Sequence, residues 1–116
     1  MKTIKFYKTV SGDSPVEDFL DNLPSKHAQK VVWVLQAIED LDIVPTSYLK
    51  KLVNTDDIWE VRITSGGNIF RLLGFMEGNN FLILNHGFQK KTQKTPRKFI
   101  AIAETRKKEY LSRSSK

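Results

Sequence analysis

Hydrophobic and polar residues alternate with a period that changes along the chain. Ile4 and Phe6 alternate with lysines in residues 2–8, which predicts a short strand with one solvated face near a sheet edge. A turn and a helix start follow at residues 12–15, where Asp13 or Ser14 can cap a short helix that runs to about Leu23. The start of the chain therefore predicts a strand and then a helix.

A second helix is expected after Pro24, with Ser25 as its cap. Its apolar residues recur at three- and four-residue spacing: Val31, Val34, Leu35, Ile38 and Leu41. The two helices would form a hairpin that ends before Pro45. Residues 46–52 fit an irregular or short helical connector.

The period becomes that of strands from Ile58 onward. Three segments predict an antiparallel meander: 58–63, 69–75 and 81–86. The clusters at 65–68 and 77–80 are typical of hairpin turns. A last helix is expected from Thr95-Pro96 to about Leu111.

The order β-α-α-β-β-β-α predicts an α+β fold in one small domain, residues 1–111, with helices packed on the meander. Residues 112–116 are expected to fray. Trp33 and Trp59 are expected in the core, and His27 is expected to be solvated.

Charge is distributed unevenly along the chain. The 116 residues carry a formal charge of +6, but residues 1–45 hold five Lys and seven acids, whereas residues 46–116 hold fourteen Lys or Arg and six acids. A polyanion is therefore expected on a face built by the second half. The absence of cysteine excludes disulfides and thiolate metal sites, and two histidines make a zinc site implausible. No membrane segment or signal sequence is visible, so a cytoplasmic protein is expected.

Three motifs carry a resemblance to a known family. They are Ile58-Trp59-Glu60-Val61-Arg62, Gly67-Asn68-Ile69-Phe70-Arg71, and the basic run from His86 to Pro96. Together they resemble the phage-derived HigB-like branch of the RelE/ParE toxin superfamily. The resemblance implies a RelE-like fold and a type II toxin that cuts messenger RNA on the ribosome without a cofactor. It also implies a cognate antitoxin, often a helix-turn-helix DNA-binding protein of the HigA kind.

Metal-free RNA cleavage requires a base for the 2′-hydroxyl, charge stabilisation at the phosphate and an acid for the 5′-oxygen. Arg71 resembles the arginine that family members hold against the scissile phosphate. Arg62, on the preceding strand, would form a phosphate fork with Arg71 if both point to one face with no acid between them. The alternative is that either arginine pairs with Glu60 or Asp57.

Lys90 and Lys91 follow the third meander strand, and one of them resembles the basic catalytic position of the family; the sequence does not decide which. Lys94, Arg97 and Lys98 continue the cationic run and are predicted to bind RNA beside the amides that open the last helix. The alternative is an electrostatic stripe that binds RNA without reacting. Many family members carry a stacking tyrosine where this chain has Thr95-Pro96.

His86 is a further candidate, because histidine titrates near neutrality, but a structural histidine bonded to the backbone fits equally well. Lys50 and Lys51 form a second basic cluster that could hold RNA or could be a solvated loop. Phe88 is expected to expose its ring in a turn and to stack on a base. The alternatives to an endoribonuclease toxin are a gyrase-poisoning ParE-like toxin and a non-catalytic RNA-binding or regulatory module.

Overall fold

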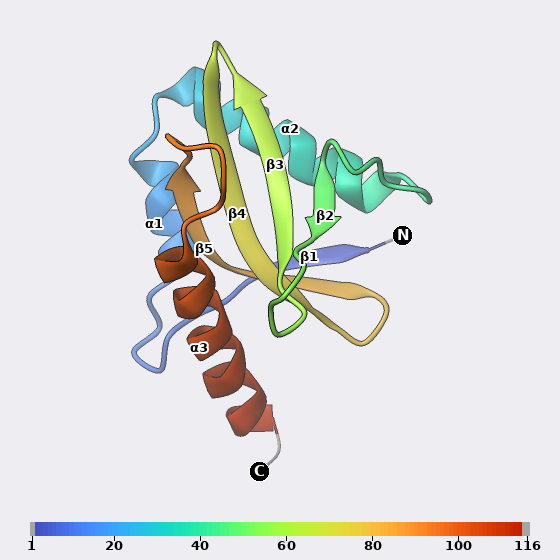
Figure 1. Ribbon diagram of the computed structural model, residues 1–116, viewed down its shortest axis with the longest axis vertical. Helices are drawn as coiled ribbons and strands as arrows, with labels where there is room; N and C mark the ends of the chain where they lie inside the picture. Colours follow the sequence, from blue (N-terminus) through green and yellow to red (C-terminus); the bar gives the residue numbers. More distant parts are fainter. Residues whose placement is uncertain (1, 115–116) are drawn as a thin grey trace.

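A five-stranded sheet forms the middle layer of the protein (Figure 1). The computed structural model describes residues 2–114. The strands are β1 (Thr3–Phe6), β2 (Leu49–Lys51), β3 (Trp59–Ser65), β4 (Asn68–Glu77) and β5 (Phe81–Gln89), and the helices are α1 (Pro15–Asp21), α2 (Ser25–Asp40) and α3 (Arg97–Ser114). The strands lie in the order β1-β5-β4-β3-β2. Only β1 pairs in parallel, with β5; the other pairs are antiparallel. The predicted α+β fold is thus confirmed.

Most predicted elements are present, with three corrections. The edge strand β1 and the Ser14 cap, which accepts from the Glu17 amide, agree with prediction. The segment expected to be a connector contains β2, which pairs with β3 and was missed because three residues carry too little periodicity. Ser25 is the first residue of α2, and no side chain caps that helix. The last helix continues past the end expected at about Leu111, to Ser114; fraying of residues 112–116 stays a prediction, and residues 115 and 116 lie outside the described residues.

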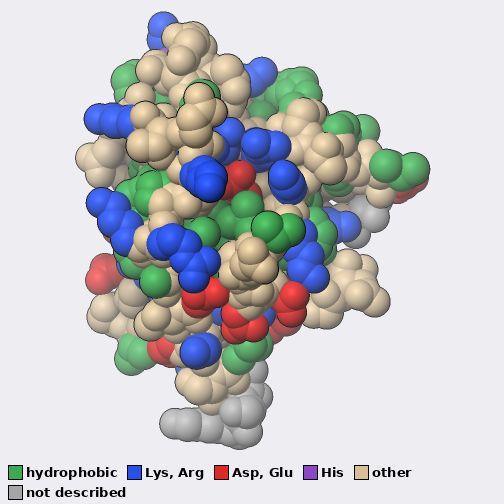
Figure 2. Space-filling view, in the orientation of Figure 1, with side chains coloured by type: hydrophobic (Ala, Val, Ile, Leu, Met, Phe, Trp, Pro, Cys, Tyr) green, Lys and Arg blue, Asp and Glu red, His purple; other side chains and the backbone are tan. Residues whose placement is uncertain are grey.

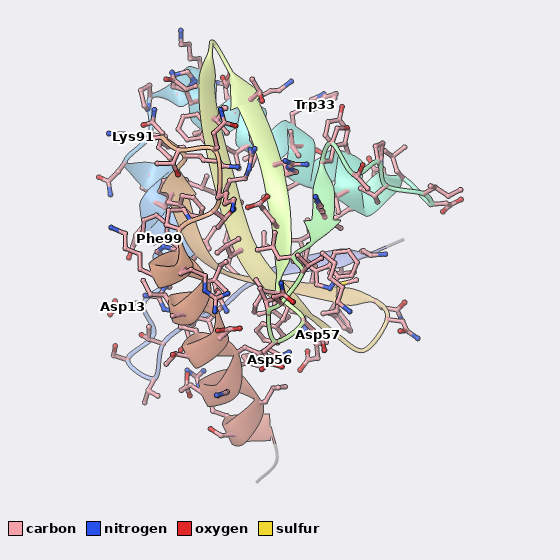
Figure 3. All side chains as sticks on the ribbon, viewed as in Figure 1. Asp13, Trp33, Asp56, Asp57, Lys91 and Phe99 are labelled. Carbon is pink, nitrogen blue, oxygen red and sulfur yellow. The ribbon has the colours of Figure 1, made fainter. Side chains whose placement is uncertain are left out.

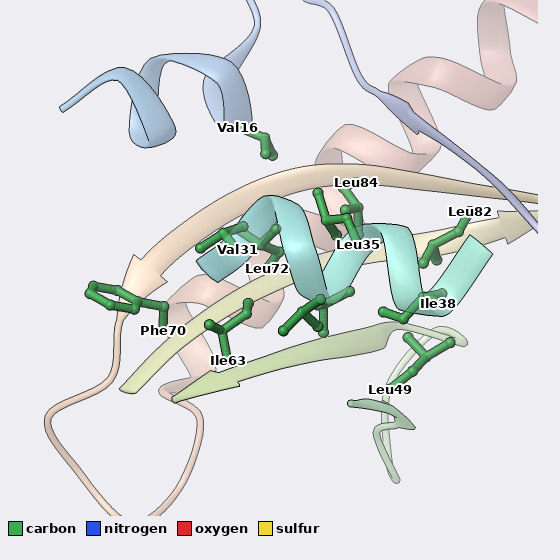
Figure 4. Close-up of a cluster of buried hydrophobic side chains, with 12 residues drawn as sticks. Val16, Val31, Leu35, Ile38, Leu49, Ile63, Phe70, Leu72, Leu82 and Leu84 are labelled. Carbon is green, nitrogen blue, oxygen red and sulfur yellow. The ribbon is translucent and has the colours of Figure 1, made fainter. Parts of the chain in front are cut away.

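The hairpin helices α1 and α2 cover one face of the sheet, and the largest apolar cluster lies between them and the strands (Figure 4). On α2, four of the side chains at the predicted spacing are buried: Val31, Val34, Leu35 and Ile38. The fifth, Leu41, follows the last residue of the helix and is exposed. Trp33 projects the other way, is 54% exposed and packs edge-on against Tyr48, so its predicted place in the core is wrong. Trp59 packs against this cluster, as predicted.

The opposite face of the sheet is covered only in part, by α3 (Figure 1). Five buried residues form the apolar cluster under this helix: Ile58, Leu73, Phe88, Ile100 and Ala103. The ends of β3 and β4 nearest their shared hairpin extend beyond α3, and the loop of residues 90–96 lies beside β4 there (Figure 1). This part of the face positions the candidate site.

A bulge in β5 decides which side chains face α3. The register between β4 and β5 shifts at Leu73/Gly74, so that Leu73 pairs with His86 and Gly74 with Leu84, which leaves Asn85 as the extra residue. After Asn85 the side chains of β5 therefore point to the opposite faces from those that a regular strand would give them. His86 and Phe88 consequently face α3. The Nδ2 of Asn85 donates to the Ala103 carbonyl at 3.0 Å, which fixes the helix against the bulge.

Gly87 lies on the other side of the same strand. A Cβ at this position would lie 2.7 Å from the Phe19 ring of α1 and 2.9 Å from Leu72. Glycine is therefore required for the close approach of α1 to β5.

Candidate functional site

Arg62 and Arg71 lie directly opposite each other in the β3–β4 ladder. Residues that face each other across an antiparallel pair project to the same side of the sheet. Both guanidiniums therefore stand on the face that α3 leaves open, as expected for a phosphate fork. Arg71 is buried, whereas Arg62 is partly exposed.

Glu60 lies between the two arginines. It is two residues before Arg62 on β3, projects to the same face and is only 2% exposed. Its Oε1 lies 3.5 Å from the Nε of Arg62 and 3.4 Å from the Nε of Arg71. The fork was predicted on the condition that no acid lies between the arginines. That condition fails, and the alternative pairing with Glu60 is the one observed.

Lys90 completes the cationic group from the end of β5. Its backbone amide donates to the Ile69 carbonyl at 2.8 Å, which holds the start of the loop against β4. The resulting cationic depression is open and has a volume of about 580 Å³. Its lining residues come from β3, β4 and the loop after β5: Arg62, Ile69, Arg71, Lys90, Lys91, Thr92 and Gln93. Figure 3 shows Lys91 on this loop.

A second hollow of about 340 Å³ adjoins the depression, because Arg62, Lys90 and Gln93 line both. The predicted RNA-binding residues Lys50, Lys94 and Arg97 line the second hollow. Lys50 reaches it because its partner in the β2–β3 ladder is Glu60, which places both on the open face. Figure 2 shows the Lys and Arg side chains gathered over this face of the molecule. The two hollows form one continuous cationic surface.

Burial and repulsion between cations lower the pKa values of Arg71 and Lys90. The pKa of Arg71 is below its ordinary value because the side chain is buried; the Glu60 carboxylate opposes this change and Arg62 adds to it. The pKa of Lys90 is lowered first by burial and next by the charge of Arg71, with Glu60 again opposing. Both causes disfavour the ammonium form of Lys90.

His86 lies under α3. Its Nδ1 is 3.3 Å from the Arg106 Nη1, which donates to the Asn85 carbonyl, and its ring packs against Phe88 and Phe99. Burial, with the charge of Arg106 second, lowers the pKa of His86 to about 4. His86 is not among the residues that line either hollow. His86 thus contacts the side chain of Arg106, where the structural alternative expected a backbone carbonyl, and its catalytic role stays a prediction.

Three other predicted residues lie apart from the depression. Phe88 is 5% exposed and packs on Phe99 with ring centres 4.4 Å apart, so its predicted exposure in a turn is wrong. Lys51 projects to the other face and pairs with Asp57 at 2.9 Å (Figure 3 labels Asp57). Lys98 stands over the Phe99 ring at 5.1 Å and lines neither hollow.

His27, expected to be solvated, is also buried. Its Nδ1 lies 2.8 Å from the Ser65 hydroxyl, and its Nε2 lies 3.3 Å from the Asn68 amide, so the ring joins α2 to the β3–β4 turn. Two residues of the site were missed as participants: Glu60, noted only as a competing partner, and Thr95, noted only for replacing a tyrosine. The signal for Glu60 was its spacing of two from Arg62, which puts both on one face of a strand.

Within residues 2–114, no group of three His, Asp or Glu side chains is arranged to hold a metal ion. In the same part of the chain, each helix is too short or too polar to cross a membrane.

The fold and the cationic surface together define a small α+β domain of the RelE-like kind. Residues 18–108 match the family of phage derived protein Gp49-like (DUF891), and the chain belongs to this family. The family is RelE-like and toxin-like, which supports membership of the toxin superfamily and implies an antitoxin partner. A comparison with curated proteins found no match.

Proposed function

We propose that the protein is the toxin of a type II toxin–antitoxin pair and acts as a ribosome-dependent endoribonuclease of the HigB-like branch. The observation that carries the proposal is the convergence of Arg62, Arg71 and Lys90 on one open depression. Fixed cations that line one depression suit the added negative charge on a phosphate under attack, and guanidiniums match the geometry of its oxygens. The protein itself would supply the stabilisation that a metal supplies in other nucleases.

In this mechanism the 2′-hydroxyl of one nucleotide attacks the adjacent phosphorus. Lys90 takes the hydroxyl proton, because burial and neighbouring cations favour its neutral amine. Arg71 and Arg62 hold the phosphoryl oxygens as charge develops on them. The departing 5′-oxygen takes a proton from solvent water, which reaches it because the depression is open. The products are a 2′,3′-cyclic phosphate and a 5′-hydroxyl.

The second hollow extends the binding path for the RNA strand. Its cations, Lys50, Lys94 and Arg97, would contact phosphates next to the scissile one. These contacts hold the backbone and do not read its sequence, which suits an enzyme that receives its substrate on the ribosome. The cognate antitoxin, for which we propose a HigA-like helix-turn-helix protein, would neutralise this surface with acidic side chains.

The test is incubation of the purified protein with translating ribosomes and a defined messenger. We expect cleavage within codons, products that end in cyclic or open 2′,3′-phosphate, and a loss of about 10²–10³-fold in rate for Arg71→Ala at equal folded concentration. Products with 3′-hydroxyl ends would contradict 2′-hydroxyl attack. Gyrase-dependent DNA breaks without RNA cleavage would identify a ParE-like poison, and neither activity would indicate an RNA-binding module.

A further inference from the structure

We propose that Glu60 is a positioning residue that holds the cationic groups of the site in their working arrangement. The inference rests on the proposed function for its catalytic consequence. Among the described residues that line the two hollows, Glu60 is the only carboxylate. A buried carboxylate is stable only when charged or hydrogen-bonding partners replace its water. The identity of these partners shows what Glu60 organises.

Glu60 pairs with both guanidiniums at their Nε atoms. The Nε of each arginine lies within ion-pair distance of Oε1 of Glu60, and the buried Nε of Arg71 has no hydrogen-bonding partner among the described residues. Each arginine gives its Nη1 to a backbone carbonyl: Arg62 to Thr46 at 3.4 Å, and Arg71 to Phe70 at 3.0 Å. Among the residues that the structure describes, neither Nη2 has a hydrogen-bonding partner. One donor group of each fork is therefore left for a ligand in the depression.

The other carboxylate oxygen anchors the cationic loop. The hydroxyl of Thr95 donates to Oε2 of Glu60, at the end of the loop opposite to the Lys90 amide. The segment that carries Lys90, Lys91 and Lys94 is thus fixed at both ends, to β4 through Ile69 and to β3 through Glu60. One side chain positions both arginines and the loop.

The charge of Glu60 gives this role a distinctive signature. The carboxylate weakens the local positive potential that attracts RNA, yet it keeps the cations in place for the reaction. Its loss should therefore leave RNA affinity equal or higher while the chemical step slows. A variant that merely unfolded would lose binding and cleavage in the same proportion.

The first experiment compares Glu60→Gln with wild type. Affinity is measured with an RNA that carries a 2′-deoxy nucleotide at the cleavage position, and turnover is measured with the matching ribonucleotide on ribosomes. We expect unchanged or tighter binding and about 10²-fold lower turnover, the scale of loss for a misplacement near 1 Å. Asp57→Asn is the matched control, because it adds the same charge beside Lys51, away from the depression, and should change neither quantity.

The pH dependence separates positioning from proton transfer. Because the Glu60 carboxylate raises the pKa of Lys90, its removal should move the rising limb of the pH–rate profile to lower pH. If the limb disappears in Glu60→Gln, Glu60 itself carries the proton and the positioning role is wrong. Equal turnover in wild type and Glu60→Gln would also overturn it.

A readout without catalysis uses NMR of the arginine side chains. In wild type the buried Nε–H of Arg71 should exchange slowly with water, and in Glu60→Gln it should exchange at least about tenfold faster. Unaltered exchange would overturn the proposal. Thr95→Val should lower turnover while Arg71 stays protected, and Thr95→Ser should restore it. If wild type cleaves no RNA, the proposed function fails, while the exchange of Arg71 still decides the role of Glu60.

Discussion

The same face of the sheet has two halves with opposite chemistry. The covered half, under α3, is built from Leu73, Phe88 and their apolar neighbours, whereas the open half presents Arg62, Arg71 and Lys90. The boundary is abrupt, because Arg71 and Leu73 are only two residues apart on β4. The strands are common to both halves, so the position of α3 decides whether a stretch of this face is core or site.

The two halves of the face shift the pKa values of their titratable side chains in different ways. His86 in the covered half has its pKa lowered to about 4, and no carboxylate is among the causes of that shift. In the open half the buried Arg71 keeps Glu60 beside it, which opposes the lowering of its pKa. Burial thus lowers the pKa on both sides of the boundary, and only at Arg71 does a neighbouring acid oppose that lowering.

The largest effect on stability should come from removing a buried side chain of the covered half. Phe88→Ala removes a ring that is 5% exposed and should lower the free energy of unfolding by about 3–5 kcal/mol. Ile69→Ala, on the same face but 36% exposed in the open half, should cost less than about 1 kcal/mol. Urea denaturation of both variants measures the contrast. A Phe88→Ala protein with wild-type stability and weakened RNA binding would instead support base stacking by Phe88.

A smaller effect is expected from the two lysines of the open half. Lys90→Ala should lower the cleavage rate by about 10²-fold with little change in RNA affinity, because Lys90 is the proposed base. Lys91→Ala should act mainly on affinity, since Lys91 is exposed at the rim. Single-turnover cleavage and binding to a 2′-deoxy RNA separate the two quantities. Equal, mild losses in both variants would favour an electrostatic stripe that does not react.

Sequence patterns predicted the elements that repeat over several turns or pairs. The helix α2 and the meander β3–β5 were predictable from periods of 3.6 and 2, and the cationic loop from composition alone. The strand β2 was not predictable, because Leu49–Lys51 is recognised by its pairing with β3 and not by any pattern of its own. A periodic pattern of apolar residues predicts a long helix or strand, whereas a three-residue edge strand is recognised only from its hydrogen bonds to the neighbouring strand.

The candidate site was predictable in its residues but not in their neighbours. Arg62, Arg71 and Lys90 were expected from the sequence, and the register of β3 with β4 brings the two arginines face to face. The exposure predicted for Phe88 is wrong because the bulge at Asn85 inverts the alternation of β5, so that α3 covers Phe88 and His86. A bulge leaves no periodic trace in nine residues, and the coverage by α3 depends on the tertiary packing.

The smallest effect, and the sharpest test of the boundary, concerns His86. The folded protein holds the pKa of His86 at about 4, against an ordinary value of about 6.5 for an exposed histidine in the unfolded chain. Between these values the unfolded chain binds more protons, so stability is full above pH 6.5 and declines as the pH falls toward 4. From pH 7 to 4.5 the His86 contribution should be a loss of about 2–3 kcal/mol. His86→Gln should remove this part of the pH dependence, measured as the difference in unfolding free energy between variant and wild type at each pH.

The same variant should retain most RNA cleavage, because His86 lies outside the depression. A His86→Gln protein that stays folded but cannot cleave RNA would place proton transfer on the covered half and make the assignment to Lys90 wrong.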